Sequence, residues 1–201
     1  MERLVWIASL AFGTVLDVGA ADASVWIYYT QPPPVERLVL LDCDLWRHKV
    51  KFSFVRGDGH RLPFKDRCFD TVVLGDVLEH CVDPLMLLGE AKRVCSSRIV
   101  VTVPDEGVWK TKHPKPSYPC KPGTWRKAVA DFKQTYCLDH ATFMDVVDED
   151  KFPHLLHQRI FTLDSLMDLL TQLNMVIYLA HLHHAQTHFG VCLERSEETV
   201  D

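Results

Sequence analysis

Short runs of apolar and β-branched residues recur along the first half of the chain, and longer amphipathic segments separate them. The composition of the runs favours strands, whereas helical spacing of apolar residues favours helices in the segments between them. Strands that alternate with helices fold as βαβ units, which build a mostly parallel sheet with helices on both faces. The sequence therefore predicts an α/β, doubly wound fold.

The expected strands are Thr14–Val18, Arg37–Leu41, Phe52–Val55, Thr71–Leu74 and Arg98–Val103. The expected helices are Leu4–Ala11, Ala23–Tyr29, Pro84–Val94 and Leu163–Leu173. Two later apolar runs, Met175–Leu182 and Thr187–Leu193, are predicted to form a closing antiparallel hairpin.

The chain has 201 residues, and a domain typically has about 150, so we expect one domain over residues 1–201. An insertion at about 105–152 follows the fifth expected strand. Its first part, Asp105–Lys133, holds seven basic and three acidic residues with interleaved aromatic residues. A long segment after the carboxyl end of a strand usually covers a site or binds a ligand, so we expect a lid here.

The composition excludes some classes of protein. The chain is 47% hydrophobic and 24% charged, as in ordinary globular proteins, and its net charge of −5 argues against a basic protein that coats nucleic acid. Seven cysteines without a CxxC pair indicate reduced thiols and a cytoplasmic location. The apolar run Leu4–Leu16 is shorter than the roughly 20 residues of a membrane span, so we expect no transmembrane segment. A signal peptide cleaved near Ala21–Ala23 is an alternative, but cleavage would remove the turn described next.

The first expected strand runs into a turn of small residues. Asp17 is followed by Gly19, Ala21 and Ala23, which leave room for a ligand to approach the backbone and the start of the next helix. A tight structural turn is the alternative interpretation. About 25 residues after Asp17, the second strand ends at Asp42, whose carboxylate can accept hydrogen bonds from both hydroxyls of a ribose; Asp44 is its rival.

The third motif lies around the third and fourth expected strands. It reads Val-Arg-Gly-Asp-Gly-His-Arg-Leu-Pro-Phe over residues 55–64 and Phe-Asp-Thr-Val-Val-Leu-Gly-Asp-Val-Leu-Glu-His over residues 69–80, followed by Asp83-Pro84. Here the chain resembles the class I S-adenosylmethionine (SAM)-dependent methyltransferases, in their Leu-Glu-His branch. The resemblance runs from about Thr14 to Val103 and resumes from His157 to the closing hairpin. It implies a Rossmann-like fold and SAM as cofactor, with S-adenosylhomocysteine as product.

The resemblance also implies a role for each motif. Asp17 and the turn at Gly19 and Ala21 would hold the methionine end of SAM, and Asp42 would bind the ribose. Asp58 would accept a hydrogen bond from the adenine amino group, which discriminates adenine because a buried polar group is paired. The implied cofactor-binding residues are Asp17, Gly19, Ala21, Asp42, Asp58, Gly59, His60 and Asp76.

Glu79 and His80 follow the fourth strand, where the family places the methyl donor and the acceptor. Methyl transfer needs alignment and, for some acceptors, removal of a proton, and histidine exchanges a proton near neutral pH. We therefore expect His80, with Glu79, to be catalytic. The alternative is that this pair stabilises the loop before the helix Pro84–Val94.

Metal sites are alternatives that we do not favour. Asp76, Glu79 and His80 resemble the metal-binding pattern of two methyltransferase groups. The candidate late ligands for a cation such as Mg²⁺ are His140, His154 and His157. The insertion could also hold zinc through its scattered thiol and imidazole donors. Those donors are His113, Cys120, Cys137, His140, His154 and His157.

The sequence thus predicts a SAM-dependent methyltransferase that acts on an oxygen or nitrogen of a small molecule. One alternative is an RNA methyltransferase that binds nucleic acid through the insertion at 105–135. Another is a non-catalytic adenosyl-binding module that serves as a partner or scaffold. Because few residues precede the first strand, we expect a homodimer or a partner subunit to cover the open N-terminal side of the site.

Overall fold

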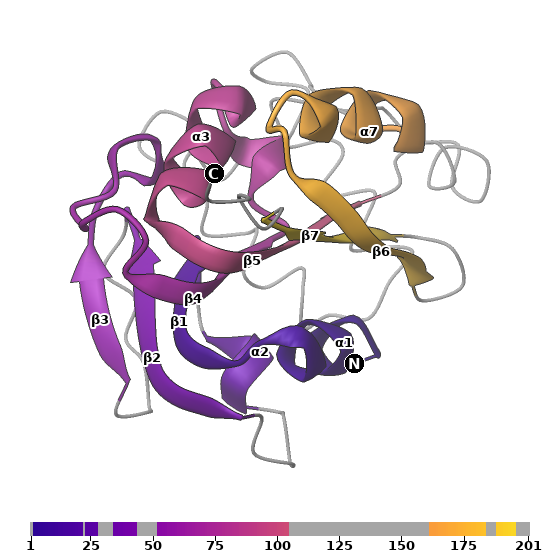
Figure 1. The fold of residues 1–201 in the computed structure, drawn as a ribbon. Coiled ribbons are helices and arrows are strands. Elements are labelled where there is room, and N and C mark those ends of the chain that lie inside the picture. The colour runs from indigo at the N-terminus through magenta and orange to yellow at the C-terminus, as the bar shows by residue number, and fades with distance from the viewer. Residues whose placement is uncertain are drawn as a thin grey trace, which may run out of the picture.

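The computed structural model describes residues 2–21, 23–27, 34–43, 52–104, 161–183 and 188–195. Within these ranges seven strands form one sheet, in the order β3-β2-β1-β4-β5-β7-β6 (Figure 1). The strands are β1 (Gly13–Val18), β2 (Val35–Asp42), β3 (Ser53–Arg56), β4 (Phe69–Gly75), β5 (Cys95–Pro104), β6 (Val176–His183) and β7 (His188–Glu194). The helices are α1 (Glu2–Leu10), α2 (Ser24–Ile27), α3 (Pro84–Val94) and α7 (Leu163–Thr171), and the short 3-10 helices are η1 (Gly59–Arg61) and η2 (Leu78–His80).

The strand directions confirm the predicted fold class. Strands β1 to β5 pair in parallel, whereas β7 is antiparallel to both β5 and β6. The chain lays β2 and β3 on one side of β1 and then returns to lay β4 on the other side. In open α/β sheets, ligands bind at the carboxyl ends of the strands where the order reverses in this way. That position lies between β1 and β4.

Helices cover both faces of the sheet, with α1 and α2 on one face and α3 and α7 on the other (Figure 1). Helix α1 buries Ile7 and Ala8 against one core cluster, which also contains Val73 of β4. Helix α3 buries Leu87 and Leu88 against the other cluster. Full burial of a leucine or isoleucine side chain stabilises a fold by about 1.5–3 kcal/mol. These contacts therefore hold α1 and α3 against opposite faces of the sheet.

Capping residues define where α3 and α7 begin. The carboxylate of Asp83 accepts a hydrogen bond from Met86 N at 3.0 Å, and Pro84 occupies the first turn of α3. Thr162 and Ser165 form a reciprocal capping box at the start of α7. Such caps satisfy backbone donors that have no partner inside the helix. The cap at Asp83 fixes where the chain leaves the loop that follows β4.

Several predictions fall outside the described residues. These are the insertion at about 105–152, the end of the expected helix at Tyr29 and the rival acid Asp44. No helix in the described part of the chain has the length and hydropathy needed to cross a membrane.

Candidate active site

Three carboxylates lie at the carboxyl ends of three adjacent strands. Asp17 lies in β1, Asp42 ends β2, and Asp76 directly follows β4. Because β1 lies between β2 and β4, the sheet brings these residues to one edge. Asp17 and Asp42 are buried, with only 3% and 7% of their surface exposed. Burial of a carboxylate costs free energy unless the group is hydrogen-bonded or paired with a cation. The contacts of each carboxylate therefore show how its burial is compensated.

The turn after β1 has a left-handed backbone at three positions. Gly19, Ala21 and Ala23 have φ angles of 71°, 43° and 59°. At Gly19 a Cβ atom would lie 2.6 Å from Cγ2 of Val77, so only glycine fits. At the two alanines the left-handed region costs about 1–2 kcal/mol per residue. Strain of this kind clusters at functional sites, and the predicted role of this turn in binding SAM stays a prediction.

Asp17 is held by the short helix α2. The indole Nε1 of Trp26 donates a hydrogen bond to Oδ2 of Asp17 at 2.7 Å. Burial raises the pKa of Asp17 to about 7, and the charge of Asp42 also raises it, whereas Trp26 and Arg3 lower it. A cationic group bound beside Asp17 would favour its charged form.

Asp42 connects the end of β2 to the turn after β1. Its Oδ2 accepts a hydrogen bond from the backbone N of Ala21 at 3.0 Å, and Cys43 Sγ lies 3.6 Å from Oδ1 as a weak donor. The backbone N atoms of Gly19 and Ala20 both donate to Leu41 O, at 2.8 and 3.2 Å. These bonds fix the position of the turn relative to the Asp42 carboxylate.

Asp58 caps η1 at the end of the neighbouring strand β3. Its Oδ1 accepts a hydrogen bond from His60 N at 2.9 Å and lies 2.8 Å from His60 Nδ1. The bond from His60 N holds the pKa of Asp58 below its usual range. Its side chain is 68% exposed, so the carboxylate remains open to a ligand.

The residues after Asp58 pack tightly. A Cβ atom at Gly59 would lie 2.6 Å from Cδ1 of Leu87 and 3.1 Å from Cγ1 of Val18, so glycine lets η1 approach α3 and β1. His60 Nε2 is buried and has no hydrogen-bond partner within the described ranges. Such a group costs about 1–3 kcal/mol unless something pairs with it. The adenine-binding role of the loop 57–60 stays a prediction.

Asp76 forms a cluster that joins α1, β5 and β7 to the end of β4. Arg3 forms an ion pair with Oδ2, Thr102 Oγ1 donates to Oδ1 at 2.8 Å, and His188 Nε2 lies 3.5 Å from Oδ2. Burial alone would raise the pKa of Asp76, but Arg3, His188 and Thr102 hold it well below its usual range. Both oxygens of Asp76 are therefore engaged inside the protein, and its predicted contact with the cofactor stays a prediction.

Glu79 and His80 lie in η2, just beyond the carboxyl end of β4. Glu79 is 1% exposed, and His80 is half-buried. The backbone N of His80 donates to Val77 O at 3.1 Å, which closes the short helix. This position agrees with the predicted one, and the catalytic roles of both residues stay predictions.

The metal hypotheses receive no test from the described residues. Within those residues, no three His, Cys, Asp or Glu side chains form a group that could hold a metal ion. His157 lies outside the described ranges, as do the zinc candidates of the insertion.

Among the side chains that hold Asp17 and Asp76, four were not predicted from the sequence: Arg3, Trp26, Thr102 and His188. Trp26 lies nine residues after Asp17, just inside the helix that follows the turn, and this position was a usable signal. Arg3 and His188 reach Asp76 from distant parts of the chain, and no local pattern marks them.

Comparison with known proteins supports the resemblance to methyltransferases. Residues 16–99 match the family model described as a methyltransferase domain, and this confirms the resemblance to class I methyltransferases. No curated protein matches the chain.

Solved structures share the fold. A SAM-dependent methyltransferase from Thermotoga maritima has 14% identity and a TM-score of 0.62, covering 97% of this chain and 88% of its own. The Burkholderia thailandensis 1,6-didemethyltoxoflavin-N1-methyltransferase, with its substrate and S-adenosylhomocysteine bound, has 14% identity and a TM-score of 0.60, covering 97% and 79%. A Haloferax volcanii complex of a methyltransferase with the Trm112 methyltransferase activator has 11% identity and a TM-score of 0.59, covering 98% and 91%. The chain therefore has the fold of the class I methyltransferases.

Proposed function

We propose that this protein is a SAM-dependent methyltransferase that transfers a methyl group to an oxygen or nitrogen of a small molecule. One observation carries the proposal. The sheet brings Asp17 and Asp42 to one edge, next to a strained turn, with the exposed carboxylate of Asp58 following the adjacent strand. SAM carries a sulfonium and an ammonium group, and carboxylates favour such cations.

In this proposal, each part of SAM has its own residues. Asp17 and the turn at Gly19 and Ala21 hold the methionine end, where a cationic ammonium offsets the cost of the buried Asp17 carboxylate. Asp42 binds the ribose hydroxyls through the oxygen that faces away from Ala21. Asp58 accepts from the adenine amino group, and Gly59 and His60 frame the ring.

The remaining residues act on the acceptor. SAM supplies an electrophilic methyl group, and S-adenosylhomocysteine is the product. His80 removes the proton from the acceptor oxygen or nitrogen, and Glu79 supports its position. Proton transfer of this kind contributes about 10²–10⁴-fold to a rate. Asp76 is proposed to contact the cofactor site from the end of β4, where Arg3, Thr102 and His188 hold its carboxylate in place.

Small molecules are the proposed acceptors because the Burkholderia thailandensis enzyme of the same fold has 1,6-didemethyltoxoflavin bound. The basic and aromatic insertion at 105–135 favours RNA as the second candidate. A partner subunit or a second copy of the chain would cover the N-terminal side of the site, and the Haloferax volcanii complex gives a precedent for a partner. The same site without turnover would make the chain an adenosyl-binding scaffold.

Calorimetric binding of SAM and S-adenosylhomocysteine tests the cofactor site. Asp42→Asn is expected to cost about 1–3 kcal/mol of affinity, because the ribose loses a charged acceptor. Asp168→Asn is the matched control, since Asp168 is exposed and belongs to α7, outside the strands and turns of the proposed site. Unchanged affinity in both Asp42→Asn and Asp58→Ala would contradict the proposed site.

Transfer of a labelled methyl group from SAM identifies the acceptor class. The protein would be incubated with a small-metabolite extract and, separately, with total RNA. Label in the small-molecule fraction supports the proposal, whereas label in RNA selects the second candidate. Intact SAM binding with no label in either fraction favours the scaffold alternative.

A further inference from the structure

The first turn of α1 brings a cation to the carboxyl edge of the sheet, where Arg3 pairs with Asp76 at the end of β4. Ile7, one helical turn after Arg3, is fully buried, and a Cβ atom at Gly75 would lie 3.6 Å from its Cδ1. Residues four positions apart share one face of a helix, so the burial of Ile7 directs Arg3 toward the end of the same strand.

The guanidinium of Arg3 is held by two partners and still has donors to offer. Its Nη1 forms the ion pair with Oδ2 of Asp76 and a long hydrogen bond of 3.4 Å to Thr102 Oγ1. A guanidinium has five N–H donors in a fixed fork. The side chain is 23% exposed, so part of it is open at this edge. Arg3 is therefore positioned inside the protein and can donate further hydrogen bonds to an anionic ligand.

Arg3 and Asp17 lie on the same face of the sheet. The indole of Trp26, which holds Asp17, belongs to the core cluster that also contains Ile7 of α1. The Asp17 carboxylate is thus on the face that α1 and α2 cover. Of the cations in the described ranges, Arg3 is the one whose charge lowers the pKa of Asp17. A cation and a carboxylate therefore meet at one edge, on one face.

The ion pair of Arg3 also lies beside the strained turn after β1. A Cβ atom at Gly19 would lie 2.6 Å from Cγ2 of Val77, the residue next to Asp76. Asp76 has a left-handed backbone, with a φ of 54°, and its N donates to Thr102 O at 3.0 Å. Such a conformation persists only where the surrounding contacts impose it. The position of Asp76, and with it that of Arg3, is therefore fixed relative to the turn.

We propose that Arg3 binds the carboxylate of the methionine end of SAM, an inference that rests on the proposed function. The methionine end carries an ammonium and a carboxylate on one carbon atom, and Asp17 is assigned to the ammonium. A ligand carboxylate close to Asp17, Asp42 and Asp76 is repelled unless a cation faces it. Arg3 supplies that cation, and the planar guanidinium matches a carboxylate through paired N–H donors. Helix α1 then forms part of the cofactor site.

Calorimetric titration of the full chain with three ligands tests this contact. S-adenosylhomocysteine carries both the ammonium and the carboxylate, its decarboxylated analogue lacks the carboxylate alone, and 5′-methylthioadenosine lacks the whole amino acid. The native protein is expected to bind S-adenosylhomocysteine about tenfold more tightly than the decarboxylated analogue, the effect of one hydrogen-bonded ion pair.

Arg3→Gln is expected to remove this preference for the carboxylate. Affinity for S-adenosylhomocysteine falls about tenfold, whereas affinity for the decarboxylated analogue and for 5′-methylthioadenosine does not fall. Arg3→Lys keeps the charge but not the planar pair of donors, so it recovers part of the preference. The deciding quantity is the ratio of two affinities of one variant, and a general loss of stability does not change that ratio.

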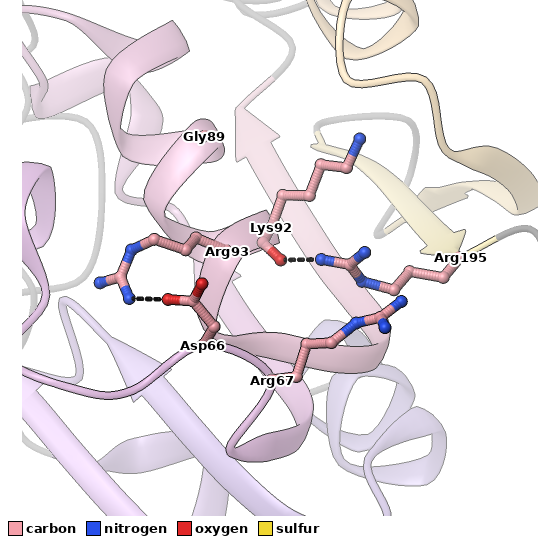
Figure 2. Close-up of a pocket in the computed structure, with 6 residues that line it drawn as sticks. All are labelled: Asp66, Arg67, Gly89, Lys92, Arg93 and Arg195. Carbon is pink, nitrogen blue, oxygen red and sulfur yellow. Dashed lines mark hydrogen bonds and ion pairs between the residues drawn. The ribbon is translucent and has the colours of Figure 1, made fainter. Parts of the chain in front are cut away.

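Arg195→Gln is the matched control. Arg195 follows β7, whose end lies beside the amino end of β5, and it donates to Cys95 O at 3.0 Å and to Lys92 O (Figure 2). This variant also removes an arginine that joins distant parts of the chain, but at the opposite edge of the sheet. Its ratio of affinities is expected to equal that of the native protein.

The outcomes distinguish failure of the Arg3 contact from failure of the proposed function. Binding of all three ligands by the native protein without a preference for the carboxylate would overturn the contact alone. An equal loss of S-adenosylhomocysteine and its decarboxylated analogue in Arg3→Gln would do the same, because Arg3 would then act only on the structure. If the native protein binds none of the three ligands, the proposed function itself is contradicted.

Discussion

Trp26 Nε1 donates a hydrogen bond to Asp17 Oδ2 at 2.7 Å, and both residues are buried. The bond joins the short helix α2 to β1 across the strained turn. It also opposes the effect of burial, which raises the pKa of Asp17 to about 7. The indole therefore adjusts the charge of a carboxylate that we assign to the methionine end of SAM, and it does so near physiological pH.

Trp26→Phe is expected to raise the pKa of Asp17 further, because the donor that stabilises the charged form is lost. At pH 7 more of the carboxyl is then protonated and SAM binds more weakly. Affinity recovers toward pH 8.5 in the variant, so its pH profile is displaced to higher pH. Calorimetric binding at several pH values measures this, and coincident profiles for the variant and the native protein would contradict it.

Asp17→Asn is expected to change how stability depends on pH. Between the ordinary pKa of 3.8 and the folded value of about 7, the folded state binds more protons at Asp17 than the unfolded state does. Stability from this group is therefore highest below pH 4 and falls as pH rises to about 7. Asparagine has no such dependence, so the variant gains relative to the native protein across this range. Urea unfolding at pH 4.5 and 7.5 tests this, and an equal difference at both pH values would count against it.

Asp58→Asn is expected to change the preference for the purine. The amide oxygen retains the cap on His60 N, while the amide NH₂ now faces the ligand. Two donors then meet at the adenine amino group, and affinity for S-adenosylhomocysteine falls by about 1–3 kcal/mol. The inosine analogue carries an acceptor at this position, so its binding improves in the variant. Loss of both ligands to the same extent would indicate a damaged loop and no direct contact.

Most helices and strands could be predicted from the sequence, because local residue patterns specify them. The expected strand Thr71–Leu74 lies inside β4, and the expected helix Pro84–Val94 has the same bounds as α3, where Asp83 caps the first turn. Asp42 was predicted from its place at the end of a strand, whereas the roles of Asp17 and Asp58 were predicted from the resemblance to methyltransferases. All three lie at or near the carboxyl ends of neighbouring parallel strands, which brings them to one edge of the sheet.

The cluster at Asp76 could not be predicted in this way. Arg3 and His188 lie 73 and 112 positions from Asp76 in the chain (76 − 3 and 188 − 76), and they meet it only because α1 and β7 pack on the same edge. The left-handed conformation of Ala21 was also hidden, since alanine gives no sign of a positive φ. Contacts between distant elements depend on packing, which periodicity along the chain does not contain.

Arg3→Gln is expected to destabilise the protein by about 1–3 kcal/mol, because a half-buried carboxylate loses its main cation. The pKa of Asp76 is held below its usual range, so this stabilisation is present above the ordinary carboxyl pKa of 3.8 and is lost as pH falls below it. The difference between the native protein and the variant should therefore shrink in acid. The double variant Arg3→Gln with Asp76→Asn is expected to recover part of the loss. A difference that stays constant down to pH 3 would mean that Arg3 acts through packing alone.

His80→Ala is expected to slow methyl transfer far more than it weakens SAM binding. A general base contributes about 10²–10⁴-fold to the chemical step and little to binding of the cofactor. The measurement is single-turnover transfer to the acceptor identified above, with SAM affinity determined in parallel. Cys81→Ala is a matched control, since Cys81 is the next residue and contacts the backbone of the same short helix, with Sγ 3.2 Å from Val77 O. Slowing by the same factor in both variants would assign His80 to the structure of this helix.

If EDTA abolishes transfer and Mg²⁺ restores it, a metal ion replaces the histidine as the group that activates the acceptor.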